Sequence, residues 1–271
     1  MKVLRADGRR ALPRALLVPA GAAVLFLLVP LVGLLLRVPW SRVVGEVARA
    51  EVLEALVLSL QSSLAAALLS LVLGLPLAMW LAQGAGRLRT FVRVLVTLPM
   101  VLPPVVAGVT LLFAYGRGSV LGGALERGFG LVLPFTTAGV VVAASYVAMP
   151  FFVLTLEGGM RSLDPRYAEA AATLGAGPWR VFRTVSLPML APSLRAGLLV
   201  AWARALGEFG ATITFAGNLA GETRTLPLAV YTALETSPEG AIVLSLVLVT
   251  ISAAVLFALR RQWFPVRGGG R

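Results

Sequence analysis

The sequence predicts an all-α integral membrane protein with six membrane-spanning helices, and three observations support this fold class. Of the 271 residues, 58% are hydrophobic and only 13% are charged, with a mean hydropathy of +0.90. A soluble domain carries about 25% charged residues, so much of this chain must face lipid. Six largely uncharged stretches reach the roughly 20 residues that a helix needs to cross a bilayer. Finally, most of the 24 Lys and Arg residues gather in alternate connections between these stretches.

The first predicted span, Ala15–Leu36, follows a basic amino-terminal segment, as the apolar core of a signal peptide would. It has 22 uncharged residues, whereas a cleaved signal peptide has an apolar core of about 7–15, so we expect it to be retained. The remaining predicted spans are Ala55–Ala82, Val94–Tyr115, Leu131–Leu156, Pro192–Ala216 and Ala241–Leu259. Together they form a membrane domain over 15–264, which leaves a cytoplasmic segment 1–14 and a disordered cytoplasmic tail 265–271.

The positions of the basic residues predict the orientation of the chain. Six spans place both termini on the same side. If that side is the cytoplasm, 17 of the 24 Lys and Arg residues are internal, six are external, and Arg204 lies within the fifth span. Basic residues bias a loop toward the cytoplasm, so both termini are predicted to be cytoplasmic. Topology thus accounts for the net charge of +12, and no nucleic-acid partner is expected.

Several residue types are missing from the chain, and their absence excludes whole classes of chemistry. There is no Cys and no His, which excludes disulfides, thiol nucleophiles and the commonest metal ligands. Lys2 is the only lysine, so the chain has no P-loop to bind the phosphates of ATP. Asp7 and Asp164 are the only aspartates, which disfavours an intramembrane aspartic protease. We expect no catalytic residue, no metal site and no cofactor in this chain.

The longest internal connection, 157–188, predicts two short helices joined by a tight turn. Asp164 is a suitable N-cap, and Pro165 suits the first helical position, where its missing N–H is not needed. Gly175 stands where a glycine can adopt the left-handed conformation that ends a helix. Pro178 then begins a second helix, with apolar side chains at helical spacing at Trp179, Phe182 and Val185. On these signals alone, the hairpin could simply connect two spans.

The residues of this hairpin resemble a known family signature. Glu169-Ala170-Ala171, then Gly175 after three residues, then Val185-Ser186-Leu187-Pro188 after nine more, is similar to the EAA loop of bacterial ATP-binding cassette importer permeases, with Val185 in place of the usual Ile. The resemblance implies that the hairpin is a coupling helix region that docks into a cleft on a separate ATPase subunit. The residues expected to carry this coupling are Glu169, Ala170, Ala171, Gly175, Arg180, Leu187 and Pro188.

The predicted fifth span contains two charged residues, Arg204 and Glu208, near its middle. They are four residues apart and should therefore share one helix face. Intramembrane charges face a bundle interior or a water-filled path. Two interpretations stay open: a structural or gating pair, or a direct role in an ion path. Thr212 and Asn218, further along the same segment, are the other candidates for the path.

Two segments narrow the resemblance to the permeases for tetrahedral oxyanions. The sequence ARALGEFGATITFAGN followed by TRTLPLAVY, within Ala203–Tyr231, resembles the molybdate branch of that family, and LPMVLPPVVAGVTLLFAYGRGSVLG, Leu98–Gly122, resembles the same group. Three prolines in the second segment free backbone groups that protein or water must satisfy, and they mark either a kink or a gate. These prolines are Pro99, Pro103 and Pro104.

The resemblance implies a type I importer permease for molybdate or tungstate in a bacterial-type cytoplasmic membrane. It further implies a homodimer with the path on its two-fold axis, two cassette ATPase subunits that use the ATP, and a periplasmic or lipid-anchored oxyanion-binding protein. Sulfate or thiosulfate is the alternative substrate. An ATP-independent channel or secondary transporter is the alternative mechanism, although such a protein does not need a cytoplasmic docking hairpin.

Overall fold

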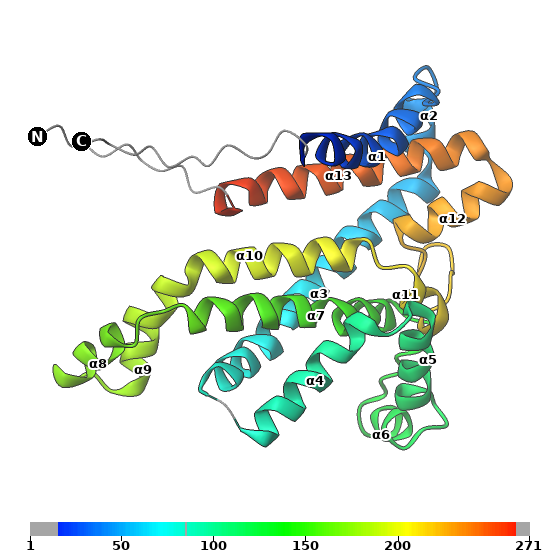
Figure 1. Cartoon of the computed structure of the whole chain (residues 1–271). Coiled ribbons are helices and arrows are strands. Elements are labelled where there is room, and N and C mark those ends of the chain that lie inside the picture. The colour runs from blue at the N-terminus through cyan, green and yellow to red at the C-terminus, as the bar shows by residue number, and fades with distance from the viewer. Residues whose placement is uncertain (1–15, 85, 264–271) are drawn as a thin grey trace, which may run out of the picture.

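Every regular element in the part of the chain that the structure describes, residues 16–84 and 86–263, is a helix. The computed structural model (Figure 1) thus confirms the predicted all-α class. The predicted terminal segments 1–14 and 265–271 lie outside the described residues. The first helices are α1 (Leu17–Leu36), α2 (Val43–Val47), α3 (Ala50–Ala82), α4 (Arg87–Val101), α5 (Pro104–Tyr115), α6 (Val120–Phe129) and α7 (Thr137–Arg161). The others are α8 (Arg166–Thr173), α9 (Pro178–Val181), α10 (Leu187–Leu206), α11 (Gly210–Phe215), α12 (Leu226–Thr236) and α13 (Pro238–Trp263).

Five helical stretches are long and apolar enough to cross a membrane. They are α1, α3, α7, the stretch Pro178–Leu206 that ends with α10, and Pro238–Phe257 of α13. The predicted total of six spans is reached only if the bent pair α4 and α5 counts as one span. Four of the predicted spans therefore correspond to single helices, and the third and fifth do not.

The predicted third span, Val94–Tyr115, is wrong as a continuous helix. The axes of α4 and α5 differ in direction by 119°. Pro103 and Pro104 carry no N–H, and a residue that precedes a proline is pushed out of the helical region. Leu102 and Pro103 accordingly adopt extended backbone, each with ψ of 135°. The prolines therefore break the helix instead of only kinking it.

The predicted fifth span, Pro192–Ala216, is also interrupted. Helix α10 ends at Leu206, and α11 begins at Gly210. Arg204 consequently lies in the last turn of α10 and Glu208 in the break, and not on the face of one mid-span helix as predicted. The physical reason is local: the Glu208 carboxylate accepts a hydrogen bond from the N–H of Ala211 at 2.8 Å, which starts a new helix at this point.

The centre of the bundle is formed by α3, α7 and α10, which lie side by side (Figure 1). Small residues allow the close approach, as is usual between membrane helices. A Cβ placed on Gly74 of α3 would lie 2.8 Å from Cδ1 of Phe152, and one on Gly197 of α10 would lie 3.3 Å from the same side chain. The buried ring of Phe152 on α7 thus fills the space between both neighbours.

Two smaller clusters extend this centre toward the end of the bundle where α2, α11 and α12 lie (Figure 1). One joins α5, α7 and α11 and includes Leu111, Val147 and Phe215. The other joins α3, α12 and α13 and includes Leu226 and Leu244. At the opposite end, α8 and α9 project beyond the spans (Figure 1). The hairpin helices and the α11–α12 region therefore lie at opposite ends of the bundle.

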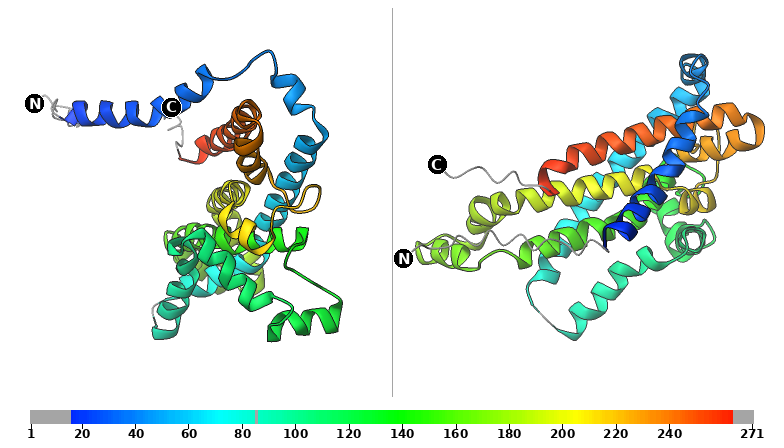
Figure 2. Two further views of the ribbon diagram at one scale, coloured as in Figure 1. Left: turned by 90° about the vertical axis from the view of Figure 1, so that its right-hand side faces the viewer. Right: turned by 45° about the horizontal axis from the view of Figure 1, so that its top comes forward.

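Helix α1 stands apart from the bundle. It extends away from the other spans in the left view of Figure 2, it contacts α13, and none of its residues is buried. Its apolar side chains therefore need lipid or another protein to cover them.

Candidate translocation and coupling sites

The predicted coupling hairpin is formed by α8 and α9. The carboxylate of Asp164 accepts a hydrogen bond from the N–H of Arg166 at 3.0 Å, as expected of an N-cap, and Pro178 is the first residue of α9. Gly175 has φ of +83°. The N–H groups of Gly175 and Ala176 donate to the carbonyls of Ala172 and Ala171 at 2.9 and 3.1 Å, which is the bonding pattern of a Schellman turn. The predicted left-handed glycine turn is therefore present.

The hairpin presents an uncovered surface of mixed character. Helix α7 continues to Arg161, so the first turn of the predicted loop 157–188 belongs to the span and the hairpin proper begins at Ser162. Large apolar side chains are exposed beyond it, among them Leu174 at 89% and Trp179 at 68%. Of the residues expected to carry coupling, Ala171 and Leu187 are half-buried and the rest are exposed: Glu169, Ala170, Gly175, Arg180 and Pro188. This surface suits a protein partner.

A short π-helical segment, Phe182–Ser186, connects α9 to α10. The N–H of Leu187 bonds to the carbonyl of Phe182, five residues earlier. Pro188 lies in the first turn of α10 and has no N–H to extend a regular helical ladder. Helix α9 is thus continuous with α10 through the π-helical segment, within the one helical stretch Pro178–Leu206.

Arg204 and Glu208 form an ion pair across the break between α10 and α11. Nη1 of Arg204 lies 2.7 Å from Oε2 of Glu208, and the other carboxylate oxygen of Glu208 is engaged by the N–H of Ala211. The Glu208 side chain is 2% exposed, whereas that of Arg204 is 29% exposed. Both oxygens of the buried carboxylate therefore have partners, and the guanidinium is the group with access to the surface.

The two other candidates for the path occupy different surroundings. Thr212 is buried on α11, and its hydroxyl has no hydrogen-bond partner in the described part of the chain. Asn218 lies beyond α11, where its side chain donates to Thr232 Oγ1 at 3.0 Å and accepts from Nε of Arg224 at 2.9 Å. Asn218 thus holds the connection between α11 and α12, and its polar contacts do not include the Arg204–Glu208 pair.

The break between α4 and α5 and the break between α10 and α11 meet in space. A Cβ on Gly210, the first residue of α11, would collide with Pro104, the first residue of α5. One turn further, a Cβ on Gly108 would lie 2.6 Å from Cβ of Thr214 and 2.8 Å from the carbonyl oxygen of Ala211. The half-helices α5 and α11 therefore pack backbone to backbone. Of the three gate candidates, Pro104 lies at this contact and Pro103 directly precedes it in the break, whereas Pro99 is buried on α4 before the bend.

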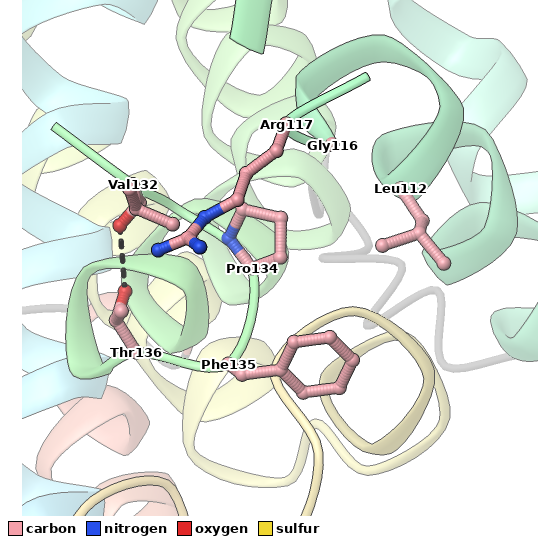
Figure 3. Close-up of a pocket in the computed structure, with 7 residues that line it drawn as sticks. All are labelled: Leu112, Gly116, Arg117, Val132, Pro134, Phe135 and Thr136. Carbon is pink, nitrogen blue, oxygen red and sulfur yellow. Dashed lines mark hydrogen bonds between the residues drawn. The ribbon is translucent and has the colours of Figure 1, made fainter. Parts of the chain in front are cut away.

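A hollow of about 500 Å³ opens at the end of the bundle opposite the hairpin. Figure 3 shows the Arg117 side chain extended over Pro134, with Phe135 below it. Phe135 has φ of +60°, a strained conformation for a residue with a side chain. Arg117 is 70% exposed and pairs with Glu126 at 3.6 Å. The hollow is lined by Leu112, Gly116, Arg117, Val132, Pro134, Phe135 and Thr136.

Sequence reasoning missed a charged cluster at the hairpin end of the bundle. Glu157 on α7 is 4% exposed. One of its carboxylate oxygens lies 2.6 Å from Nη2 of Arg93 on α4 and 2.8 Å from Nη2 of Arg161. The spacing of Glu157 and Arg161 is a visible sequence signal for an ion pair. The contact with Arg93 joins residues far apart in the chain, and no local pattern predicts it.

Comparisons with known proteins agree with the expected family. The family of binding-protein-dependent transport system inner membrane components matches residues 74–264. The molybdenum transport system permease protein ModB of Mycobacterium tuberculosis is 44% identical over 248 residues, which cover 92% of this chain and 94% of that protein. The sulfate transport system permease protein CysT of Escherichia coli is 37% identical over 172 residues, 63% of this chain and 62% of that protein.

Among solved structures, a chain of a bacterial alginate ABC transporter, in complex with an alginate-bound periplasmic protein, has the same fold. The TM-score is 0.74 with 15% sequence identity, over 95% of this chain and 96% of that one. At this identity the likeness concerns the fold alone, and it agrees with the importer-permease architecture that the sequence predicts.

Proposed function

The chain belongs to the family of binding-protein-dependent transport system inner membrane components, and we propose that it forms the membrane path of an ATP-driven importer for molybdate. The observation that carries this function is the exposed hairpin α8–α9, in a chain whose sequence contains no ATP-binding motif. Greater identity over more of the chain to a molybdenum permease than to a sulfate permease supports the choice of ion. Tungstate, of nearly the same size and charge, is expected to share the path.

In this proposal, a separate cassette ATPase binds the hairpin and hydrolyses the ATP. Glu169, Ala170 and Ala171 enter the cleft of that subunit, and the turn at Gly175 keeps the two helices in a fixed relation. The continuous connection from α9 through the π-helical segment to α10 supports a rigid lever. The chain itself carries no catalytic residue and holds no resident cofactor, because the partner supplies the nucleotide chemistry.

We further propose that two copies of the chain form the path, with two ATPase subunits on the hairpin side. The exposed helix α1 supports this arrangement, because a second copy would cover part of an apolar surface that the first leaves open. A periplasmic or lipid-anchored binding protein delivers the ion at the opposite end, where the hollow beside Arg117 lies. Both termini are cytoplasmic in this orientation, in keeping with the excess of basic residues on the hairpin side.

The paired breaks in the bundle are the proposed gate. Pro103 and Pro104 interrupt one span, and Glu208 lies in the interruption of another. Since the Glu208 carboxylate is matched by Arg204 and by a backbone N–H, it presents little uncompensated negative charge to a passing oxyanion. We infer that the pair holds the break in shape and that the gate opens when α5 and α11 move.

The test is ATP hydrolysis by the reconstituted complex of this chain, its cassette ATPase and its binding protein. Molybdate and tungstate should stimulate hydrolysis through the binding protein, and sulfate should not. Stimulation by sulfate, without stimulation by molybdate or tungstate, would identify the alternative substrate as the transported ion. Ion flux without any ATPase subunit would instead identify a channel or a secondary transporter.

A further inference from the structure

A charged cluster links the helix that leads to the proposed gate with the helix that leads to the proposed coupling hairpin. Its members are Arg93, Glu157 and Arg161. Glu157 lies in the last turns of α7, five residues before the hairpin begins at Ser162. Arg93 lies in the middle of α4, whose far end is the break at Pro103. The cluster therefore joins the segment that leads to the hairpin to the segment that leads to the gate.

Arg93 makes most of the contacts in this cluster. Its Nη2 lies 2.6 Å from Oε1 of Glu157, and its Nε lies 3.1 and 3.3 Å from the two carboxylate oxygens. The same Nη2 also donates to the carbonyl of Leu81 at 3.3 Å. That carbonyl is in the last turn of α3, where no later helical N–H is available to bond it. One guanidinium thus holds together α3, α4 and α7.

Arg161 contributes a positive charge next to Glu157, as Arg93 does, but it does not link Glu157 to a second helix. It lies on the same helix as Glu157, four residues later, and its Nη2 is 2.8 Å from the same carboxylate oxygen. Both arginines therefore neutralise the buried Glu157, whose side chain is 5% exposed. Of these two arginines, only Arg93 joins Glu157 to a different helix.

The rest of α4 is held mainly by a narrow apolar stripe. Val92, Val96 and Pro99 face the bundle and pack with Arg93 along one side of the helix. The other side is exposed, with Phe91, Val94, Leu95 and Leu98 between 45% and 58% exposed. In Figure 1, α4 diverges from α7 at its amino-terminal end. Arg89 adds one further contact, with its guanidinium 5.5 Å from the centre of the Trp80 ring on α3. The contact between Arg93 and Glu157 is thus the ion pair that fixes α4 against α7.

We propose that Arg93 is a positioning residue for transport, which ties α4 to the end of α7 so that movement of the coupling hairpin changes the break at Pro103. This inference rests on the proposed function, because it assigns a route between its two sites. A buried carboxylate that loses one of its charged partners is strongly disfavoured, so the contact persists while both helices move. The two helices then turn together.

The matched pair Arg93→Gln and Arg161→Gln tests this assignment. Each variant removes one of the two positive charges that pair with Glu157 and leaves the other arginine in place. In the reconstituted complex, Arg93→Gln should reduce ion-stimulated ATP hydrolysis by about fivefold or more, the size of a typical coupling between sites. Arg161→Gln should retain most of the stimulation. Arg93→Lys keeps the charge but loses the forked guanidinium that bonds both oxygens of Glu157, and its stimulation should fall between those of the two glutamine variants.

A distance measurement separates positioning from simple stabilisation. The chain has no cysteine, so spin labels can be placed at Thr90→Cys on α4 and Ser162→Cys beside α7. The distance should stay narrow and unchanged between nucleotide-free and vanadate-trapped complexes, and also in Arg161→Gln. In Arg93→Gln it should broaden or shift. This measurement needs no transported ion, so it remains valid if the substrate is not molybdate.

Two results would overturn the inference. Equal loss of stimulation in Arg93→Gln and Arg161→Gln would reduce the cluster to a stabilising charge network. Unchanged stimulation and an unchanged label distance in Arg93→Gln would show that α4 is positioned by its apolar stripe alone. Failure of molybdate to stimulate the wild-type complex would instead contradict the proposed function.

Discussion

Removal of either member of the Arg204–Glu208 pair should destabilise the protein, but by unequal amounts. Glu208 is almost completely buried, with 2% of its side chain exposed, and Arg204 retains 29%. In Arg204→Ala the carboxylate stays buried with only the N–H of Ala211 as a partner. Breaking a buried pair in this way costs about 3–5 kcal/mol.

Glu208→Ala should cost less. The guanidinium that remains is partly exposed and therefore less desolvated, and the main loss is the hydrogen bond between the carboxylate and the Ala211 N–H. A hydrogen bond to a charged group contributes about 1.5–3 kcal/mol. The double variant Arg204→Ala/Glu208→Ala loses the same bond without leaving a charge behind. It should match Glu208→Ala and be more stable than Arg204→Ala by roughly 2 kcal/mol, the difference between those two ranges.

The assay is thermal unfolding of the purified complex in detergent for the two single variants and the double variant, followed by transport in proteoliposomes. The predicted order of stability is wild type, then Glu208→Ala together with the double variant, then Arg204→Ala. The structural reading of the pair is wrong if both single variants unfold at the wild-type temperature while Arg204→Ala slows transport and Glu208→Ala accelerates it. That pattern would mean that Arg204 attracts the anion directly.

Three further predictions follow from the geometry. Gly175→Val should abolish most ion-stimulated ATP hydrolysis while leaving membrane insertion intact, because φ of +83° strains any side chain at this position. The matched control is Gly177→Val, at a position with open space around it and φ of −65°. Equal activity of the two variants would contradict the hairpin assignment. Gly108→Val should lower stability by about 1–3 kcal/mol by overpacking the α5–α11 contact, and an unchanged unfolding temperature would mean that these half-helices can separate freely. A single cysteine at Gly118 should react with an impermeant reagent from outside intact cells, whereas one at Ser162 should react only after permeabilisation; labelling of Ser162 in intact cells would reverse the topology.

The long apolar runs made much of the fold predictable. Helices α1, α3, α7 and α13 fall where uncharged stretches indicate spans, because hydropathy reports directly which segments leave water. The turn at Gly175 was predictable as well, because a glycine that follows a helix commonly adopts the left-handed conformation that ends it. These features depend on residues that are neighbours in the sequence.

The interruptions were harder to predict because hydropathy does not report helix continuity. Val94–Tyr115 is uncharged throughout, yet the adjacent prolines turn it by 119°. The break at Glu208 accompanies a buried carboxylate that accepts a hydrogen bond from the Ala211 N–H at the start of α11. The link between Arg93 and Glu157 could not be predicted at all, since the two residues are 64 positions apart and only the folded chain brings them together.

The meeting of α5 with α11 has a consequence for how the chain is made. At 1.5 Å per residue, α5 is about 18 Å long and α11 about 9 Å, and neither alone can cross a hydrocarbon core of about 30 Å. The ribosome delivers α5 roughly 95 residues before α11, the separation of Gly116 from Gly210 in the sequence. During that interval the face of α5 around Gly108 lacks the α11 backbone that covers it in the finished fold. We expect α5 to remain at the insertion machinery or packed against α7 until then. It should reach its final depth in the membrane only after synthesis has passed Phe215.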